Sequence, residues 1–261
     1  MRTAPATKYN EVRQQAIDLL DVGGATPLEI MRFRREAQSL RNADPSEGLV
    51  IDAIASGLAN DIADMQRKFA QAITAGGGVD AVATYAIALE YTNQPLVLRD
   101  TVQKYWDDIC KSSNYFLAVR DALGRSGYLQ TAYRLERDAY KFGIKPRDLG
   151  DHDLEEVMGQ RRISEDDIRD LVCFVKEELR TRKVRLEHHE SAMVHDDDGR
   201  MQILYEFVCT LDLENLLDIE SEIFAALAEK NYSAETSGAM VVGLARKRST
   251  EEAEKIKEAS N

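Results

Sequence analysis

Three helical-hairpin patterns follow one another between about Pro45 and Pro146, at a spacing of 33 to 34 residues. Within each pattern, apolar or small residues recur at offsets of i, i+4 and i+7, which lie on one face of a helix. A fixed period in this range is typical of helical solenoids, whose units stack because one hairpin cannot bury its apolar face alone. The chain is therefore predicted to contain an array of stacked helical hairpins.

The three units align with one another position by position. The first helices are expected to begin at Leu49, Val82 and Phe116, and a turn signal separates each of them from a second helix. The aligned packing positions are Ala53, Ala86 and Arg120, then Ser56, Leu89 and Leu123, then Met65, Leu98 and Ala132, then Phe69, Val102 and Glu136, and finally Ala72, Tyr105 and Ala139. Small residues at several of these positions would let the two helices of a hairpin approach closely.

This pattern resembles the tetratricopeptide repeat. That family has a small residue and then an aromatic in its first helix, and Ala, an aromatic and Ala in its second helix before a closing Pro. The matching residues are Ala53, Phe69 and Ala72 in the first unit, Ala86 in the second, and Ala132, Ala139 and Pro146 in the third. The departures are Ser56, Met65, Leu98, Val102, Tyr105, Arg120 and Glu136. The resemblance covers about 100 of the 261 residues, and an ordinary helical domain is the alternative that it leaves open.

The resemblance implies protein binding, because members of the family usually hold ligands along a concave surface lined by the first helices. The equivalent positions here form the predicted partner-binding site: Ile54, Leu58, Ile87, Glu90, Tyr91, Asp121 and Arg125. They combine apolar, aromatic and charged groups, which suits an extended peptide or a helix. The same residues would also fit a packed core or a solvent-facing surface, and the sequence does not separate these alternatives.

The distribution of charge predicts a domain boundary near Leu149. Residues 1–148 hold 19 Lys and Arg and 19 Asp and Glu, whereas residues 149–261 hold 15 and 27, so the second part carries the whole net charge of -12. Such a shift is typical of a change of domain, and it argues against nucleic-acid binding by the second part, because phosphate contacts rely on Lys and Arg. We therefore predict a tetratricopeptide-like helical domain over 1–148, an acidic α+β domain over 149–248 and a charged flexible tail over 249–261.

Two helical stretches are expected before the repeats, and a degenerate fourth hairpin at the end of the array is one interpretation of this pair. The first covers residues 9–20 and ends at the Gly23-Gly24 pair. Thr26 can cap the second helix, with Pro27 at its first position and Glu29 completing a capping box. The second helix also carries a basic face, which is either solvated or in contact with an anionic partner, formed by Arg32, Arg34 and Arg35.

Beyond Pro146 the pattern changes to helix, strand, strand, helix, strand. A helix is predicted after Ser164, and two extended runs follow around the acidic turn 196–199, where Asp-Gly is a strong hairpin signal. Asp212 is the expected N-cap of another helix, and residues 239–245 are the expected last strand after a loop over 231–238. This order predicts a mostly α chain, in which a helical-hairpin solenoid is followed by a small α+β domain with an antiparallel sheet.

The strongest candidate for a metal or catalytic site is His188, His189, Glu190 and His195 with the acidic turn that follows. Imidazoles and carboxylates bind transition metals, but on a strand His188 and His189 point to opposite faces, and the helical HExxH spacing is absent. The stretch 76–78 is Gly-Gly-Gly and lacks the Lys and Ser or Thr of a phosphate-binding loop. We therefore assign no catalytic residue, no metal ligand and no cofactor.

The expected function is non-enzymatic binding of another protein or peptide, as an adaptor, chaperone or regulatory subunit. The alternative is an enzyme or metal-dependent effector with its site in the C-terminal domain, and the sequence leaves enzyme activity open. A third hypothesis, nucleic-acid regulation through the Arg32–Arg35 face, ranks below both, so no nucleic-acid partner is expected. Three widely separated cysteines, Cys110, Cys173 and Cys209, indicate free thiols in a reducing compartment. With no secretory signal and no apolar run of about 18 residues, a cytoplasmic protein without a membrane partner is expected. The sequence indicates neither the identity of the partner nor the oligomeric state.

Overall fold

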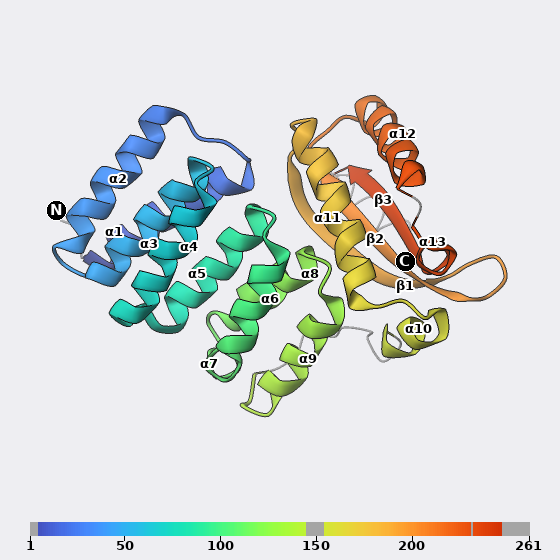
Figure 1. Ribbon diagram of the computed structural model, residues 1–261, viewed down its shortest axis with the longest axis horizontal. Coiled ribbons are helices and arrows are strands. Elements are labelled where there is room, and N and C mark those ends of the chain that lie inside the picture. Colours follow the sequence, from blue (N-terminus) through green and yellow to red (C-terminus); the bar gives the residue numbers. More distant parts are fainter. Residues whose placement is uncertain (1–4, 145–153, 231, 247–261) are drawn as a thin grey trace, which may run out of the picture. The chain divides into compact units, whose positions relative to one another are not determined.

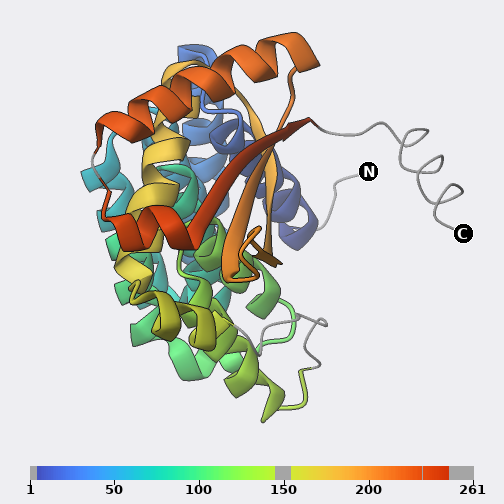
Figure 2. The same cartoon turned by 90° about the vertical axis from the view of Figure 1, so that its right-hand side faces the viewer.

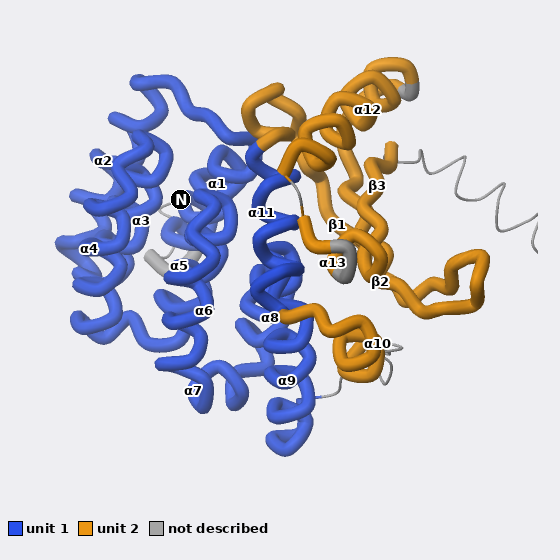
Figure 3. Tube along the Cα trace, turned by 45° about the vertical axis from the view of Figure 1, so that its right-hand side comes forward, with its two compact units in different colours: residues 1–151, 165–177 blue, residues 152–164, 178–261 orange. Residues whose placement is uncertain are grey.

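The computed structural model describes residues 5–144, 154–230 and 232–246, and it confirms a mostly helical chain with a small sheet in its C-terminal part (Figures 1 and 2). The predicted boundary at Leu149, the closing Pro146 and the tail over 249–261 lie outside the described residues. By its internal contacts the chain forms two compact units, which Figure 3 colours separately: unit 1 is residues 1–151 with 165–177, and unit 2 is residues 152–164 with 178–261. The helical unit therefore includes residues 165–177, which the charge distribution assigns to the second domain.

Unit 1 is a succession of helices joined by short turns. Its described elements are α1 (Pro5–Asp21), α2 (Pro27–Arg41), α3 (Pro45–Leu58), α4 (Ile62–Ala72), the π-helix η1 (Ile73–Gly77), α5 (Gly78–Tyr91), α6 (Pro95–Lys104), α7 (Trp106–Cys110), α8 (Phe116–Arg125), α9 (Leu129–Tyr140) and residues 165–177 of α11 (Glu165–Thr181). The predicted repeat units coincide with the hairpins α3–α4, α5–α6 and α8–α9, so the helical array is confirmed. The predicted capping box of α2 is also present, because Thr26 and Glu29 each accept a hydrogen bond from the other's backbone N–H.

The aligned packing positions explain why these hairpins stack. All of them are buried except Tyr105 and Arg120, which are partly buried. Ala53 and Ala86 are fully buried in α3 and α5, where their small side chains let neighbouring helices approach. Helix α3 also carries Gly48, and a Cβ there would lie 2.6 Å from the carbonyl oxygen of Ala37 in α2. The repeat seen in the sequence therefore reflects buried packing positions that recur from one hairpin to the next.

Two departures of the third hairpin from the tetratricopeptide-like pattern form a charge pair. Arg120 occupies the position of a small residue, and Glu136 occupies the position of an aromatic. In the structure, Nη1 of Arg120 lies 3.5 Å from Oε2 of Glu136, and both side chains are largely buried. Asp121 also contacts Arg120, with 2.5 Å between Oδ1 and Nη2. The two departures are thus complementary, because each buried charge meets its counter-charge on the other helix of the hairpin.

The second helix of the middle hairpin, predicted as one helix, is interrupted at Tyr105. Helix α6 ends at Lys104 and α7 begins at Trp106, while Tyr105 has φ -112° and ψ 22°, outside helical geometry. Trp106 Nε1 donates to Oδ2 of Asp138 in α9 over 3.1 Å. Helix α7 therefore joins the middle hairpin to the third.

One described segment, Ile62–Tyr91, has the length and apolar composition of a membrane span, with a mean hydropathy of 1.4 in its best window. Half of that window is buried inside the protein. The backbone breaks at Gly76, where φ is 97°, and α4 and α5 pack against each other on either side of the break. The segment is thus two helices of the core, which makes it weak support for a membrane span.

Residues 165–177 of α11 pack onto the third hairpin. Thr131 donates from its backbone N–H to Oε1 of Glu165 over 2.6 Å, and from Oγ1 to Oε2 over 2.7 Å. Gly127, with φ +82°, lies so close to α11 that a Cβ would be 2.6 Å from Cα of Arg169. Because Ile168 and Val172 of the predicted apolar face are fully buried, this part of α11 acts as a terminal helix of the array.

Unit 2 contains one three-stranded sheet in the order β1-β2-β3. Its described elements are α10 (Leu154–Arg161), the end of α11, β1 (Leu186–His195), β2 (Met201–Cys209), α12 (Leu213–Glu229), α13 (Ala234–Ala239) and β3 (Met240–Arg246). Strands β1 and β2 form the predicted antiparallel hairpin, with His195 opposite Met201 and a turn in which Gly199 has φ +73°. One face of β2 provides the core, because its side chains are fully buried at Ile203, Tyr205, Phe207 and Cys209.

The antiparallel arrangement holds for the hairpin only, because β3 runs parallel to β2, with Ile203 opposite Met240 and Cys209 opposite Arg246. A parallel neighbour needs a crossover long enough to return to the same end of the sheet, and α12 and α13 form that crossover. Helix α13 occupies most of the stretch predicted as a loop, and Ser233 caps it by accepting from the N–H of Thr236. The sequence pattern also did not indicate α10.

We expect Gly127→Ala to destabilise unit 1 by about 3 kcal/mol and Gly143→Ala by about 1 kcal/mol. Both glycines have a positive φ, +82° and +81°, and would therefore suffer the same left-handed strain, but only Gly127 has the backbone of α11 within reach of a new Cβ. Urea unfolding followed by the fluorescence of Trp106, the single tryptophan, reports on unit 1. Equal losses for the two variants would show that α11 does not pack here as described.

Candidate protein-binding face

The predicted partner-binding residues lie on α3, α5 and α8, and we call the surface of these three helices the first-helix face. The structure brings three of the residues together at the C-terminal ends of α5 and α8. Arg125 Nε lies 3.3 Å from Oε2 of Glu90, and Cζ of Arg125 lies 5.5 Å from the centre of the Tyr91 ring. The second contact is a cation–π interaction. Part of the predicted site is therefore a real cluster of side chains.

Glu90 is the centre of this cluster, because its side chain is only 1% exposed and a buried carboxylate needs counter-charges. Lys176 of α11 forms an ion pair with Oε1 of Glu90. Its Nζ also donates to the backbone carbonyl of Glu90 over 3.3 Å and to that of Arg125 over 3.4 Å. These carbonyls belong to the last turns of α5 and α8, where helix ends leave acceptors unpaired and favour cations. Lys176 therefore joins α5, α8 and α11 at one point.

Burial and charge act against each other on Arg125. Removal from water alone would lower the pKa of Arg125, but the charge of Glu90, followed by smaller effects of Tyr91, Asp121 and Asp21, raises it, so the guanidinium stays charged. Burial raises the pKa of Tyr91 to about 12, so its hydroxyl stays neutral. A charged guanidinium beside a neutral phenol can bind a carboxylate or a backbone carbonyl.

Helix α1 lies against the first-helix face. It packs on α3 and α5, and a Cβ on Gly57 of α3 would lie 3.5 Å from Cδ2 of Leu20. Tyr9 OH donates to Oδ2 of Asp80 in the first turn of α5 over 2.7 Å, and Arg13 forms an ion pair with the same carboxylate. Burial is the main reason for the raised pKa of Tyr9, and the charge of Asp80 adds to it.

The far end of α1 lies near the far end of α5. After burial itself, negative charges that include Asp21 and Asp18 of α1 contribute to the raised pKa of Tyr91, the last residue of α5. Because the two helices start together at Asp80 and end together at Tyr91, α1 runs parallel to α5. The first-helix face thus already holds a helix of the same chain.

Burial divides the predicted site residues into two groups. Ile54 and Glu90 are buried, so neither is exposed to a partner. Leu58 and Ile87 are partly buried and pack against the core of unit 1. The residues that keep part of their surface at the C-terminal ends of the helices are Tyr91, Asp121 and Arg125.

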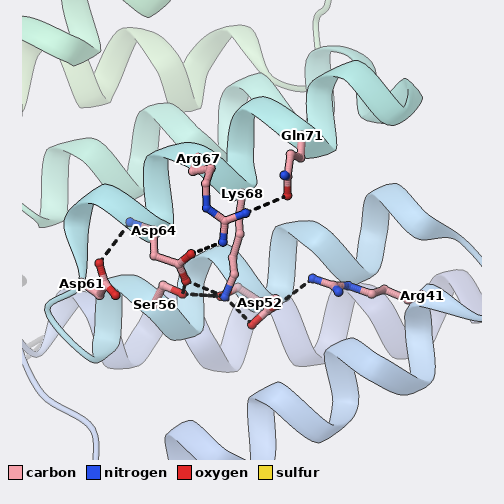
Figure 4. Close-up of polar contacts among 8 residues, drawn as sticks. All are labelled: Arg41, Asp52, Ser56, Asp61, Asp64, Arg67, Lys68 and Gln71. Carbon is pink, nitrogen blue, oxygen red and sulfur yellow. Dashed lines mark hydrogen bonds and ion pairs between the residues drawn. The ribbon is translucent and has the colours of Figure 1, made fainter.

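A second network of charges holds α3 against α4 (Figure 4). Lys68 Nζ lies 2.7 Å from Oδ2 of Asp64, 2.9 Å from Oδ1 of Asp52 and 3.0 Å from Oγ of Ser56. Ser56 Oγ donates to Asp64 over 2.7 Å, and Arg41 Nη2 from α2 lies 2.6 Å from Oδ2 of Asp52. The hydrogen bonds from Lys68 and Ser56 hold the pKa of Asp64 well below its ordinary value. Since these charges satisfy one another, we assign the network a structural role.

Sequence reasoning missed Lys176, Asp80 and the contacts of α1. Glu90 and Lys176 are 86 residues apart, and Tyr9 and Asp80 are 71 residues apart, so no helical spacing connects them. Asp80 lies in the first turn of α5, where a carboxylate is favoured for reasons unrelated to binding, and it precedes the predicted start of that helix at Val82.

The histidines of the β1–β2 hairpin take part in the hairpin itself. His188 Nε2 lies 3.3 Å from Oε1 of Glu190, and the His189 ring stacks on Tyr205 with 4.9 Å between ring centres. Asp196 shapes the turn by accepting from the N–H of Arg200 over 2.7 Å. Among the described residues, no group of three or more His, Cys, Asp or Glu side chains is placed to hold a metal ion.

No protein-family model, curated protein or solved structure matches the chain. The resemblance to the tetratricopeptide repeat therefore stays a prediction from the residues quoted for it. The geometry of the first-helix face is the basis for the function proposed below.

We expect Glu90→Gln to destabilise unit 1 by about 3 kcal/mol, because Arg125 and Lys176 would keep their charges without a counter-charge. Trp106 fluorescence during urea unfolding measures the change. The matched control is Asp100→Asn, another carboxylate-to-amide change at an ion pair, 3.5 Å from Arg99 but exposed. It is expected to cost less than about 0.5 kcal/mol, and a similarly small loss for Glu90→Gln would contradict the central role of Glu90.

The α3–α4 network predicts a pH dependence. Because the folded-state pKa of Asp64 is lowered, its contribution to stability is complete above the ordinary Asp value of about 4 and is lost as the pH falls through the folded-state value. In Asp64→Asn, the free energy of unfolding should therefore be smaller at neutral pH and fall less steeply below about pH 4. Lys68→Gln removes the main hydrogen-bond partner of Asp64, so the free energy of unfolding should also fall less steeply below about pH 4 in this variant. An unchanged pH dependence below about pH 4 in both variants would refute this assignment.

Proposed function

We propose that unit 1 is a non-enzymatic protein-binding module, acting as an adaptor, chaperone or regulatory subunit, whose first-helix face accepts an amphipathic helix. The observation that supports this proposal is the docking of α1 on α3 and α5. Helix α1 buries one side against that face and exposes the other, which is how an amphipathic helix is recognised by a partner surface.

The contacts of α1 define what a partner helix would need. Ala16, Ile17 and Leu20 are buried, and Tyr9 and Arg13 reach Asp80. Relative to Tyr9, these residues stand at offsets of 4, 7, 8 and 11, which places them on one side of a helix. A partner with an aromatic, a basic and three apolar residues at this spacing would make the same contacts.

The partly buried cluster at the other end of the face adds a preference for charge. Arg125 and Tyr91 lie where α1 contributes Asp18 and Asp21. A partner helix that ends in one or two carboxylates would place them beside the charged guanidinium of Arg125. We therefore expect the partner helix to be basic near its start and acidic near its end.

Helix α1 must leave the face before such a partner can bind. A tethered segment competes for its own site at an effective concentration on the order of 1 mM. Helix α1 also packs on α2, where Lys8 lies 2.5 Å from Glu36 and Arg32 donates to Gln15 over 3.2 Å. The apolar contacts and the Asp80 ion pair are what hold α1 in place.

The test is the binding of a labelled peptide of residues 5–21, measured by fluorescence polarisation. Ile17→Asp in the full chain removes a buried contact of α1, so this variant should bind the peptide at least about 10-fold more tightly than the wild type does, a difference of about 1.4 kcal/mol. The control peptide carries Arg13→Glu and should lose affinity, and adding Asp80→Lys to the chain should restore it.

An Ile17→Asp protein that keeps its helical content but does not bind the peptide would refute the proposal. So would equal binding of the wild-type and Arg13→Glu peptides, because specific docking requires the Asp80 contact.

A further inference from the structure

Helix α2 in unit 1 and helix α12 in unit 2 both expose large apolar side chains. On α2, Leu28 and Met31 are 70% and 48% exposed, and on α12, Leu217 and Phe224 are 55% and 43% exposed. Each helix buries its opposite side in its own unit, through residues such as Phe33 in α2 and Ile223 in α12. Exposed apolar side chains that share one helix face mark a surface suited to contact.

The charges beside these apolar residues differ in sign. Arg32 and Arg35 follow Leu28 at offsets of 4 and 7, so they lie on the same face of α2. Both are exposed, and Arg32 Nη2 donates to Oε1 of Gln15 over 3.2 Å. The exposed side of α2 is therefore apolar near its N-terminal end and basic toward its C-terminal end.

Helix α12 presents the complementary pattern. Leu217 and Phe224 are seven residues apart on one face, and the exposed carboxylates beside them belong to Glu214, Asp218 and Glu229. Asp218 and Glu214 lie near Leu217, so one end of the face is more acidic than its centre. The two helices therefore match in both apolar content and charge.

We propose that α2 of one molecule docks antiparallel on α12 of a second copy of this chain. Seven residues of helix span about 10.5 Å, so the distance from Leu28 to Arg35 equals that from Phe224 to Leu217. In this pairing Leu28 and Met31 pack on Phe224. Arg32 and Arg35 meet Asp218 and Glu214 beside Leu217.

Charge complementarity selects this pairing over a symmetric one. Two α2 faces would bring arginines together, and two α12 faces would bring carboxylates together, both of which are repulsive. The contact is heterologous and generates head-to-tail chains or closed rings.

The affinity is modest because a single helix pair buries less surface than about 1,200 Å², the lower bound for stable complexes. Association therefore becomes visible only at protein concentrations on the order of 100 µM, and salt weakens it because the ion pairs are exposed.

Sedimentation equilibrium of the full chain tests the proposal with two variants. The α2 variant carries Arg32→Gln and Arg35→Gln, and the α12 variant carries Glu214→Gln and Asp218→Asn, so the two altered faces cannot form ion pairs with each other. At low salt, the average mass of the wild type should rise with concentration, whereas each variant alone stays a monomer. An equimolar mixture of the two should form a complex that stops at two chains, because one intact α2 and one intact α12 remain. A control with the exposed pair Arg134→Glu and Arg137→Glu on α9 should associate like the wild type.

A wild-type mass that does not change with concentration would overturn the proposal, and so would a mixture of variants that stays monomeric. A wild type that stops at two chains while both variants still dimerise would also overturn it, since the interface would then lie elsewhere. Circular dichroism confirms that the variants, all exposed substitutions, keep their helical content.

Discussion

The helical unit depends on the neutralisation of Glu90. A carboxylate that is 1% exposed can keep its charge only where other elements bring cations to it. Arg125 comes from α8 and Lys176 comes from α11, so one buried charge links the middle hairpin, the third hairpin and the terminal helix. Lys176 also donates hydrogen bonds to the backbone carbonyls of Glu90 and Arg125, in the last turns of α5 and α8. This contact accounts for the inclusion of residues 165–177 in the helical unit, although they lie beyond the change in charge density along the sequence.

Polar pairs also explain why the repeat pattern is degenerate. Ser56 stands where the family has an aromatic, and in the structure its hydroxyl joins Asp64 and Lys68. Arg120 and Glu136 stand where a small residue and an aromatic are usual, and they face each other. Each of these polar residues is joined to the other helix of its hairpin by a hydrogen bond or an ion pair. A motif search weighs such positions one at a time and cannot see that they compensate.

The helical hairpins could be predicted from the sequence, because their buried positions repeat with helical spacing from Ala53 to Ala139. The β1–β2 hairpin could also be predicted, because the alternation of side chains along β2 coincides with the burial of Tyr205 and Phe207. Contacts between distant segments could not be predicted, since no local spacing links Tyr9 with Asp80 or Glu90 with Lys176. For the same reason the parallel pairing of β3 was missed, because its direction depends on the path of α12 and α13. The predicted binding residues lie on the first helices of the three hairpins, but Ile54 and Glu90 among them are buried, which no periodicity reveals.

The proposed function requires that α1 can leave the first-helix face without unfolding the helices beneath it. Hydrogen exchange of the backbone amides measures this directly, because it separates local opening from global unfolding. The amides of α1 should exchange through an opening that costs several kcal/mol less than the opening of α3 and α5. If α1 exchanges only together with α3 and α5, at the free energy of global unfolding, then α1 is a permanent part of the core and the face is not a binding site.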